Sequence, residues 1–417
     1  MPDVGHEKQE QTDVVIIGGG PAGLSAAIEL KKCGIPRVIV LERESEAGGI
    51  PRHCGHIGFG VQEFRRILAG PDYSRKLVQL ARRANVEIRT STTVVEAREG
   101  GVLKTSSNRG EEAIWPRRVV YSTGCRESSR AARLISGSRP LGIMNTGALQ
   151  SMIYLKELKP FQRPIIVGTE LVSFSAILTC RHAGIQPVAM LEQRSQVTAH
   201  KLCSLYPKLV GVPLLLGVRL VSIAGRDRVT AAEVQYATGA VQEIECDGVI
   251  LTGQFTPEAS LAMCGHLHID RHSRGPTIDQ YFRCSDPAFF ATGNVLRPVE
   301  TAGWSWKEGR RAGRCVAEDL GGGLPATQSG IRITPNTPII RFCIPQMVFP
   351  AHGRLGMKDL QLRFSRPANG SLIVKDSSQT VLKKRLSVRG DQRVLIPLAK
   401  LIKNNRGDQL FVDFDEG

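Results

Sequence analysis

The sequence predicts an α/β protein built from two similar doubly wound units, with a β-rich domain at its C-terminal end. Three observations lead to this prediction. Between residues 13 and 42, an apolar strand, a glycine-rich turn, a helix, a second strand and an acidic residue follow one another. The same order recurs between residues 163 and 192, and repetition of a whole unit indicates two similarly folded domains. After residue 330 the chain changes to short β-type stretches separated by Pro, Gly, Asn and Asp.

The first repeat carries a complete signature for holding the diphosphate of a dinucleotide. Its first strand, residues 14–17, leads into Gly18-x-Gly20-x-x-Gly23. The first glycine permits a tight turn, the second lets a diphosphate approach the backbone, and the third lets helix and strand pack closely. The diphosphate would lie at the positive end of the helix. The next strand ends in Glu42, the expected partner of ribose hydroxyls. Strand, helix and acid agree, so we predict a Rossmann-like dinucleotide site and not a purely structural glycine turn.

The second repeat keeps the order of elements but has an altered phosphate loop. After Gly168 it carries Glu170 and Ser173 where the first repeat has its second and third glycines. A carboxylate there would collide with a diphosphate and repel it, at a cost of about 4 kcal/mol for two charges ~4 Å apart at an effective dielectric near 20. We therefore expect a nicotinamide dinucleotide to bind poorly. The alternative, that Glu170 turns to solvent and the site still works, stays open.

Length and charge narrow the possible classes of protein. A chain of 417 residues should hold two or three domains. Its 55 Lys and Arg exceed its 39 Asp and Glu, but no arginine block alternates with aromatic residues, so nucleic acid is not the expected partner. A solvated basic face, or a surface for acidic partners or anionic lipid, fits better. Without an apolar leader or membrane-spanning stretch, a cytoplasmic location is expected, with peripheral association with the inner face of the membrane as an alternative.

Cysteine usage argues against disulfides and against an iron–sulfur cluster carried by this chain. The ten cysteines are spread singly and none forms a CxxC pair. The densest group of potential metal ligands is Cys264, His266, His268 and His272. We expect this stretch to be a strand near a turn, in which histidines two apart would share one face, so zinc is conceivable. Without a second cluster, we do not predict a metal site.

Between the repeats, residues 48–60 form a glycine-rich segment of the kind that wraps a cofactor through its backbone. Its polar members Arg52, His53, Cys54 and His56 are candidates for lining the reactive end of the site. The histidines could equally be ordinary surface-loop residues. Further on, we expect a helix at 73–84, a strand at 87–97 and a strand at 119–122 that ends in Thr123-Gly124.

A third signal follows the second repeat. A strand at 288–291 leads into Gly293-Asn294, and after a short loop a helix begins near 299–301 and carries Trp304. Such a helix points its amino end into the crevice, where it stabilises negative charge on a ring oxygen or nitrogen.

The C-terminal part of the chain follows a linker at 321–330 that is rich in glycine and small residues. We expect a small antiparallel β-domain, a sandwich, from its strand pattern. No catalytic constellation is evident there, so a docking module is the preferred interpretation. The expected strands are 331–333, 339–342, 360–364, 371–375, 381–388, 393–397 and 409–414.

With these units in place, residues 12 to about 325 resemble the flavoproteins of the pyridine nucleotide–disulfide oxidoreductase superfamily. Within it, the chain is similar to the α-type subunits of hydrogen cyanide synthase, opine oxidase and hydroxyproline or proline dehydrogenase complexes. The phrases that carry this narrower match are at 48–60, 167–176 and 293–310. The resemblance implies a two-dinucleotide-binding-domain flavoprotein of the GR2 type. Its expected domains are an FAD-binding domain (12–130 and 270–325), a degenerate NAD(P)-binding-like domain (131–269) and the β-rich domain (331–417).

The resemblance also implies an FAD site. The residues expected to contact FAD are Gly18, Gly20, Pro21, Ala22, Gly23, Glu42, Arg43, Gly49, Ile50, Val94, Thr123, Gly124, Gly293, Asn294 and Thr301. Many relatives carry aspartate at the Asn294 position, so a charge is lost here while hydrogen bonding is kept. Disulfide reductases of the superfamily also carry a CxxxxC pair beside the flavin, whereas only Cys54 lies in that part of this sequence. The residues expected to act near the reacting atoms are Arg52, His53, Cys54, Thr301 and Trp304.

Partners and reaction follow from the same resemblance. It implies an FAD-dependent subunit of an amino-acid dehydrogenase or oxidase complex, whose substrate is opine-like, imino-acid-like or glycine-like. A second flavoprotein subunit would oxidise the amino acid, and electrons would pass to a small [2Fe–2S] subunit or to the respiratory chain, not to NAD. Two alternatives stay open. One is a free-standing NAD(P)H-dependent flavin oxidoreductase, and the other is a non-catalytic nucleotide-binding scaffold.

Overall fold

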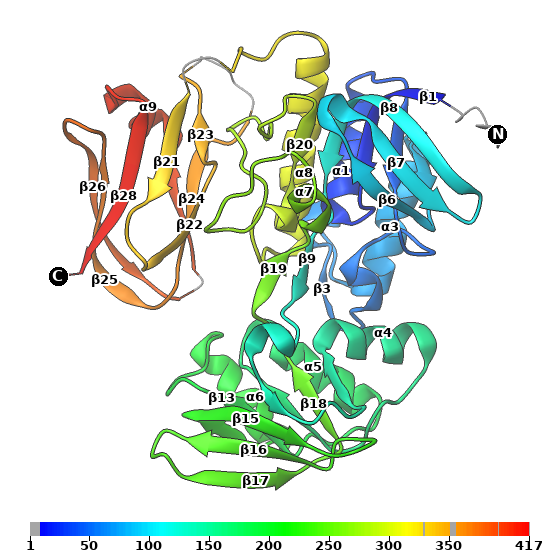
Figure 1. Ribbon diagram of the computed structural model, residues 1–417, viewed down its shortest axis with the longest axis vertical. Helices are drawn as coiled ribbons and strands as arrows, with labels where there is room; N and C mark the ends of the chain where they lie inside the picture. Colours follow the sequence, from blue (N-terminus) through cyan, green and yellow to red (C-terminus); the bar gives the residue numbers. More distant parts are fainter. Residues whose placement is uncertain (1–8, 328–329, 351–355, 391, 417) are drawn as a thin grey trace, which may run out of the picture. The chain divides into compact units, whose positions relative to one another are not determined.

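The computed structural model describes residues 9–327, 330–350, 356–390 and 392–416 (Figure 1). Tertiary contacts divide the chain into two compact units, and each contains one of the repeats. Unit 1 comprises residues 1–49, 74–125 and 257–417, and unit 2 comprises residues 50–73 and 126–256. The chain enters unit 2 after Gly49 and returns to unit 1 after Tyr73; it enters again within β9 (Cys125–Glu127) and returns within β19 (Phe255–Pro257).

A seven-stranded sheet forms the centre of unit 1, in the order β5-β2-β1-β8-β7-β6, with β20 paired to β8. Strands β1, β2, β5, β8 and β20 run parallel. The side chains at 14–17 and 38–41 are almost completely buried, as expected for strands covered on both faces. The strands are β1 (Gln9–Ile17), β2 (Val38–Leu41), β5 (Glu87–Arg89), β6 (Thr92–Ala97), β7 (Leu103–Ser107), β8 (Gly110–Tyr121) and β20 (Phe289–Ala291).

Two long helices of unit 1, α1 (Pro21–Lys32) and α8 (Ala302–Leu320), lie against each other (Figure 1). Their backbones approach closely because α8 presents glycines to α1. A Cβ at Gly309 would lie 2.1 Å from the Ala22 carbonyl oxygen, and one at Gly313 would lie 2.7 Å from that of Ala26. The buried carboxylate of Glu29 on α1 also accepts bonds from α8, from Arg310 and Arg314.

The parallel strands place three loops at one edge of the sheet. In β1, β8 and β20 the chain runs in the same direction, and the strands are neighbours. The loops that follow them are 18–20, 122–124 and, after Thr292, 293–301. Ligands of open α/β sheets bind outside the carboxyl ends of the strands. This edge is therefore where the first repeat would hold its dinucleotide.

The β-rich C-terminal domain belongs to unit 1 and contains two sheets, as predicted. The rings of Phe364 and Phe414, one from each sheet, lie 5.0 Å apart in the core. The expectation of a purely antiparallel domain was wrong, because β21 and β28 pair in parallel. The five-stranded sheet contains β23 (Met347–Val348), β21 (Ile331–Pro335), β28 (Gln409–Glu416), β25 (Ala368–Lys375) and β26 (Thr380–Val388), and the three-stranded sheet contains β22 (Ile340–Ile344), β24 (Asp359–Phe364) and β27 (Arg393–Pro397), followed by α9 (Leu398–Asn404).

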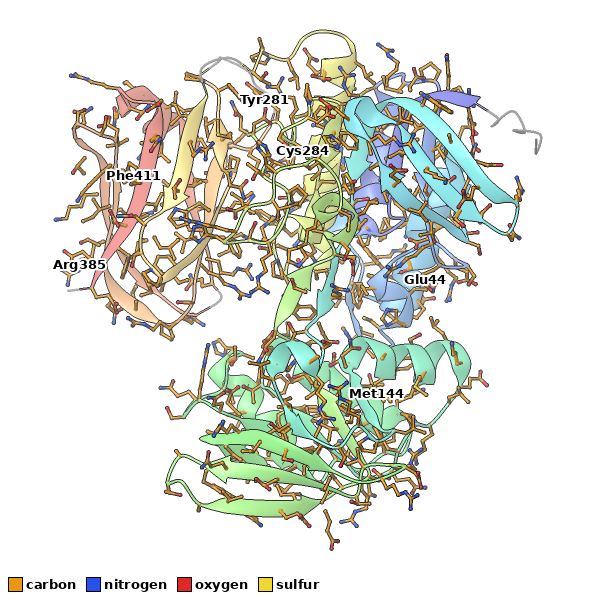
Figure 2. All side chains as sticks on the ribbon, in the orientation of Figure 1. Glu44, Met144, Tyr281, Cys284, Arg385 and Phe411 are labelled. Atoms are coloured by element: carbon orange, nitrogen blue, oxygen red, sulfur yellow. The ribbon has the colours of Figure 1, made fainter. Side chains whose placement is uncertain are left out.

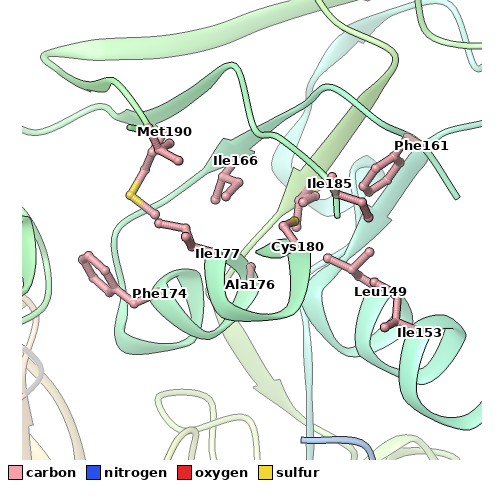
Figure 3. Close-up of a cluster of buried hydrophobic side chains, with 12 residues drawn as sticks. Leu149, Ile153, Phe161, Ile166, Phe174, Ala176, Ile177, Cys180, Ile185 and Met190 are labelled. Atoms are coloured by element: carbon pink, nitrogen blue, oxygen red, sulfur yellow. The ribbon is translucent and has the colours of Figure 1, made fainter. Parts of the chain in front are cut away.

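Unit 2 repeats the strand–turn–helix–strand order around a parallel sheet, in the order β11-β18-β12-β13-β14. Its core is a cluster of apolar side chains, to which helices α4 and α5 and strands β12, β13 and β18 contribute (Figure 3). A second sheet, β10-β15-β16-β17, completes the unit. The elements are β10 (Ser136–Gly137), β11 (Ile143–Asn145), α4 (Thr146–Lys156), β12 (Pro164–Val167), α5 (Leu171–His182), β13 (Ala189–Glu192), α6 (Leu205–Leu209), β14 (Leu214–Leu216), β15 (Val218–Ala224), β16 (Ala231–Tyr236), β17 (Val241–Glu245) and β18 (Gly248–Leu251).

Two expected strands differ in the structure, and several short elements remain to be described. The strand expected at 87–97 is two strands, β5 and β6. The expectation of a strand around His266 and His268 was wrong. Cys264 caps the short helix α7, and the irregular stretch from there to β20 contains Tyr281 and Cys284 (Figure 2). The linker predicted at 321–330 includes residues 328–329, which lie outside the described residues. The remaining elements are β3 (Ile57–Phe59), α2 (Val61–Phe64), β4 (Leu68–Ala69), α3 (Gly70–Arg83) and α7 (Ser260–Met263).

In the part of the chain that the structure describes, no helix combines the length and apolar character needed to cross a membrane.

Candidate functional site

The glycine turn after β1 has the close contacts that its sequence predicts. Gly18 has a φ of +106°, and a Cβ there would lie 2.6 Å from the Ser122 carbonyl oxygen. A Cβ at Gly23 would lie 2.0 Å from the Gly18 carbonyl oxygen and 2.5 Å from Ser122 Oγ. The first and third glycines of the motif therefore let α1 pack directly on the turn.

Gly20 has a different role, because the space beside it is open. A Cβ there would meet only the Cα of Gly49, at 3.8 Å. Gly20 is also the N-cap of α1, has no side-chain cap and is followed by Pro21. The amide groups of the first helical turn at Ala22 and Gly23 are thus available to an anion, which the positive end of the helix stabilises. This cradle fits a diphosphate.

The acid at the end of β2 is buried and held by the glycine turn. Glu42 is 8% exposed, its Oε2 accepts the Gly19 amide at 2.9 Å, and its Oε1 accepts the Glu44 amide at 3.0 Å. A carboxylate can accept about four hydrogen bonds, so two acceptor positions remain for ribose hydroxyls. The side chain of the neighbouring Arg43 is exposed, and its Nε lies 3.8 Å from Glu44 Oε1. Val94, on β6, is half-buried.

The loop after β8 borders the same edge. Thr123 Oγ1 donates to the Glu258 carbonyl oxygen at 2.6 Å. Gly124 has a φ of +78°, and no atom lies within 4 Å of the position where its Cβ would be. The space beside Gly124 is therefore open.

The loop after β20 packs against the start of α1. A Cβ at Gly293 would lie 2.7 Å from the Cβ of Ala22, and the Gly293 amide donates to Glu308 Oε2 at 3.0 Å. The Asn294 side chain closes the loop on itself. Its Oδ1 accepts the Glu300 amide at 2.8 Å, and its Nδ2 donates to the Glu300 carbonyl oxygen at 3.2 Å.

Helix α8 begins where the sequence predicted, within one residue. Thr301 is its N-cap and accepts the Trp304 amide through Oγ1 at 3.3 Å. The indole ring of Trp304 is half-buried, and the Arg393 guanidinium carbon lies 3.4 Å from the ring centroid. An aromatic ring and a capped helix terminus thus stand at the end of the loop that begins at Gly293.

The remaining predicted residues, Ile50, Arg52, His53 and Cys54, belong to unit 2. The Ile50 side chain is exposed, whereas Cys54 is 7% exposed and its Sγ lies 3.5 Å from Gln150 Oε1. Burial, with the nearby Glu127 carboxylate, raises the pKa of the Cys54 thiol to about 12. The thiol is therefore protonated at neutral pH and has no thiolate character.

His53 lies beside the beginning of α4. A Cβ at Gly147 would be 3.8 Å from His53 Cε1 and 3.7 Å from Glu127 Oε2. The Gly147 and Gly253 amides both donate to the Glu127 carboxylate. These two bonds favour the ionised form, but burial outweighs them, so the pKa of Glu127 is raised. Two groups of candidate residues lie in different units: unit 2 contains Arg52, His53 and Cys54, and unit 1 contains Thr301 and Trp304. That the two groups form one site stays a prediction.

The phosphate loop of the second repeat is occupied by its own glutamate. Glu170 Oε1 accepts the Gln254 amide at 2.8 Å. A Cβ at Gly253 would lie 2.2 to 2.4 Å from the carboxyl atoms of Glu170, so the side chain is packed on the protein and does not turn to solvent. The pKa of Arg133 is lowered, because desolvation outweighs the opposing attraction of the Glu127 and Glu170 carboxylates. The Glu170 carboxylate therefore lies in the electrostatic field of the Arg133 guanidinium.

The acid of the second repeat is also occupied. Glu192 is 8% exposed, and its Oε2 accepts the hydroxyls of Thr169 and of Thr198, the latter at 3.2 Å. Its Oε1 accepts the Arg194 amide at 3.0 Å. Glu192 thus accepts three hydrogen bonds from the protein, one more than Glu42, and has about one acceptor position left for a ribose hydroxyl.

The sequence did not predict a largely buried group of charged and polar residues beside the loop 293–301. Their signal in the sequence was weak, because Gln361 and Arg363 alternate with apolar residues in β24 as solvent-facing residues do, yet both are buried. This group is not a metal site, since in the described part of the chain no three His, Cys, Asp or Glu side chains are grouped as metal ligands. The members of the buried group are Arg297, Glu300, Glu308, Gln361, Arg363 and Arg393.

Fold and site together define a two-repeat dinucleotide-binding oxidoreductase whose first repeat has an open cradle. The chain belongs to the pyridine nucleotide-disulphide oxidoreductase family, whose model matches residues 12–309. This confirms the predicted fold class and superfamily. It also confirms FAD as the cofactor, in agreement with the open cradle, and the chain is an FAD-binding oxidoreductase.

Relatives of known activity are distant and mostly longer. The alpha subunit of sarcosine oxidase from Rhizobium meliloti is 24% identical over 79% of this chain and 31% of its own length. The HcnB subunit of hydrogen cyanide synthase from Pseudomonas protegens is 28% identical over 53% of this chain and 50% of its own. An opine oxidase subunit from Agrobacterium tumefaciens is 28% identical over 68% of this chain and 61% of its own. The chain thus spans between about a third and three fifths of these proteins.

Solved structures share the fold. Thioredoxin reductase from T. acidophilum superposes with a TM-score of 0.63 at 20% identity, over 74% of this chain and 99% of its own. L-proline dehydrogenase from P. horikoshii superposes with a TM-score of 0.58 at 20% identity, over 76% of this chain and 57% of its own. These likenesses concern the two-repeat architecture alone.

Proposed function

We propose that this chain is the FAD-containing subunit of a complex that oxidises a small amino-acid-type substrate, and that its electrons pass to an iron–sulfur partner or the respiratory chain instead of NAD. The substrate class is opine-like, imino-acid-like or glycine-like. The bound flavin would supply the redox chemistry, and the protein would supply binding, orientation and electrostatics. The names of the relatives support this proposal, because they include subunits of sarcosine oxidase, opine oxidase and hydrogen cyanide synthase.

The observation that carries the electron route is the occupied second cradle. In reductases of this architecture, the second repeat would have to receive the nicotinamide dinucleotide. Here Glu170 is bonded to the Gln254 amide and Glu192 is bonded to two threonine hydroxyls. NADH would have to displace these bonds and place its diphosphate beside a carboxylate. Electrons should therefore enter the flavin from another donor.

The chain's own residues have defined tasks in this proposal. The turn at Gly18–Gly23 and the start of α1 bind the diphosphate, and Glu42 orients the adenosine ribose. The capped start of α8 at Thr301 would stabilise negative charge on a bound flavin. Trp304, Arg52, His53 and Cys54 are proposed neighbours of the reacting atoms, with Cys54 acting only as a neutral thiol. The proposed partners are a second flavoprotein and a small [2Fe–2S] protein of the same complex, and the basic charge fits peripheral attachment to an anionic membrane surface.

An anaerobic titration tests the electron route. The purified, FAD-loaded chain is mixed with NADH or NADPH while flavin absorbance is recorded, with dithionite as the positive control. We expect dithionite to bleach the flavin and the nicotinamide cofactors to leave it oxidised. Rapid bleaching by NADH would instead favour the free-standing NAD(P)H-dependent reductase. A purified chain that takes up no flavin but is stabilised by ATP would favour the nucleotide-binding scaffold.

The substrate class needs the complex. The chain, tagged and purified from its native host with its associated subunits, is mixed anaerobically with sarcosine, proline, hydroxyproline, glycine or octopine. One of these compounds should bleach the flavin, and the same compound should leave the isolated chain unchanged if a partner subunit holds the substrate. A complex in which none of them reduces flavin would contradict the proposed substrate class.

A further inference from the structure

A largely buried group of charged and polar side chains joins the loop 293–301 to the C-terminal β-domain. We call it the loop–domain cluster. From the FAD-binding side it contains Arg297, Glu300 and Glu308, and from the β-domain it contains Gln361, Arg363 and Arg393.

Glu300 lies at the centre of the loop–domain cluster. Its side chain is 6% exposed, and its Oε1 accepts Arg363 Nη2 at 2.6 Å. Its Oε2 accepts Arg393 Nη1, and Arg297 Nε lies 3.9 Å from Oε1. Arg363 also donates to the Val299 carbonyl oxygen at 3.1 Å. Two strands of the β-domain therefore hold one carboxylate and the adjacent backbone of the loop.

Arg297 forms the second link. It is completely buried and donates twice to Glu308, at 2.7 and 3.0 Å. Arg297 Nη2 also donates to Gln361 Oε1, on the β-domain, at 3.0 Å. The same Glu308 carboxylate accepts the Gly293 amide. A single connected network thus runs from the β-domain to the first residue of the loop.

The far end of the loop is held as well. The Arg393 guanidinium carbon lies 3.4 Å from the centroid of the Trp304 ring, on the first turn of α8. At the near end, Asn294 bonds both backbone groups of Glu300. The loop is thereby fixed at its beginning, middle and end, and its first residue packs on Ala22 at the FAD cradle.

Mere docking of a β-domain does not need this chemistry. Burying charges costs free energy unless every one is paired, and a well-packed apolar interface is usually as stable. Buried ionic networks are better at enforcing one geometry, because a shifted register leaves a charge without its partner. The loop–domain cluster therefore points to a positional role and not to attachment alone.

We propose that the C-terminal β-domain fixes the loop 293–301 in the conformation that receives the flavin end of FAD, and that Glu300 is the positioning residue through which it does so. The proposal requires only FAD binding and is independent of the substrate. The β-domain then forms part of the FAD site at one step removed, while the glycine turn at 18–23 and Glu42 hold the adenosine end by themselves.

The test compares two ligands on the same apoprotein. ADP carries the half of FAD that the glycine turn and Glu42 bind, whereas FAD also needs the flavin end. For Glu300→Gln and for Arg393→Gln, we expect FAD affinity to fall roughly tenfold, within the range typical of coupling between sites. ADP affinity should change less than about twofold. Isothermal titration gives both values, and the quenching of flavin fluorescence reports how the ring is held.

The matched control is Arg366→Gln, which removes an exposed arginine of the same β-domain that pairs with Glu416. It should leave both affinities unchanged. Arg393→Gln removes a partly exposed member of the cluster and leaves Glu300 paired with Arg363, so it decides the matter if Glu300→Gln does not fold. Equal losses of FAD and ADP affinity, or no loss of FAD affinity in Arg393→Gln, would overturn the proposal.

Discussion

The two repeats share a backbone and differ in what their side chains leave open. Gly18 and Gly168 both have a positive φ, +106° and +118°, and both donate to the strand that follows the helix at 2.8 Å. Gly20 and Glu170 are both N-caps in extended conformation. Yet the first leaves open space and the second fills it with its own carboxylate. The fold supplies the cradle, and single side chains decide whether it accepts a ligand.

The third position of the motif shows the same principle in packing. Gly23 lies so close to the Gly18 carbonyl oxygen that any side chain would collide. At the corresponding position, Ser173 is completely buried and its Oγ lies 2.5 Å from Thr252 Oγ1, a hydroxyl that donates to the Val167 carbonyl oxygen. The second repeat has thus replaced close backbone contact by a small hydrogen-bonded network.

The largest expected effect comes from giving the first cradle the side chain of the second. Gly20 has a φ of −81°, which any residue adopts, so Gly20→Glu should fold. A carboxylate ~4 Å from the diphosphate costs about 4 kcal/mol, or roughly a thousandfold in FAD affinity. The purified variant should therefore be colourless, as judged by its absorbance spectrum.

Two control variants show whether Gly20→Glu loses FAD through the charge of the new side chain, through its size, or because any added glutamate weakens binding. Gly20→Gln has the same size without the charge, so it should keep substantially more FAD than Gly20→Glu. Gly321→Glu places the same acid on an exposed residue after α8 and should bind FAD normally. A yellow Gly20→Glu protein would break the comparison between the two cradles.

The next effect concerns stability. Gly23→Ala places a methyl group 2.0 Å from the Gly18 carbonyl oxygen, so α1 must shift, and such overpacking typically costs about 1–3 kcal/mol. Ser173→Ala keeps the volume of the second repeat and loses one hydrogen bond, at about 1 kcal/mol. Denaturant unfolding of the two apoproteins should rank them in that order. Equal destabilisation would show that close packing at Gly23 is not the reason for that glycine.

A smaller effect is expected from opening the second cradle. Glu170→Gly removes the carboxylate beside the diphosphate but leaves Glu192 bonded to Thr169 and Thr198. NADH should therefore bind only weakly to this variant. Adding Thr169→Gly frees part of Glu192 and should improve NADH affinity by about tenfold over the single variant, the value of one charged hydrogen bond. Fluorescence titration with NADH measures both, and tight binding to Glu170→Gly alone would show that Glu192 is no obstacle.

Much of this difference could be predicted from sequence, because glycine spacing and strand periodicity are local. The Gly18-x-Gly20-x-x-Gly23 turn, the acid Glu42 and the start of α8 at Ala302 follow from residues close in the chain. The acid at position 170 was also evident from the altered loop, and its effect on NADH binding stays a prediction.

Other features depend on contacts between distant residues. The partners of Glu170 and Glu192 come from loops whose positions no local pattern fixes. Gln361 and Arg363 alternate with apolar residues as in a half-exposed strand, yet the polar face of β24 is covered by the loop 293–301. The parallel pairing of β21 with β28 likewise joins residues 77 positions apart, such as Arg332 and Gln409.

The smallest expected effect concerns how the helix of the first cradle is held. Burial raises the pKa of Glu29, but the bonds from Arg310 and Arg314 on α8 outweigh it, so the pKa is lowered from its usual 4.5. A depressed pKa in the folded state stabilises the fold above the unfolded-state pKa. That stability is lost as pH falls through the folded-state value.

Glu29→Gln should therefore be less stable than the natural chain by about 1 kcal/mol at pH 7, since both arginines are partly exposed. The difference should shrink below about pH 4 and vanish at lower pH, because the natural carboxylate is then protonated too. Denaturant unfolding of both apoproteins between pH 3 and pH 7 measures it. If the gap stayed constant across this range, the stabilisation would come from the shape of the side chain and not from its charge.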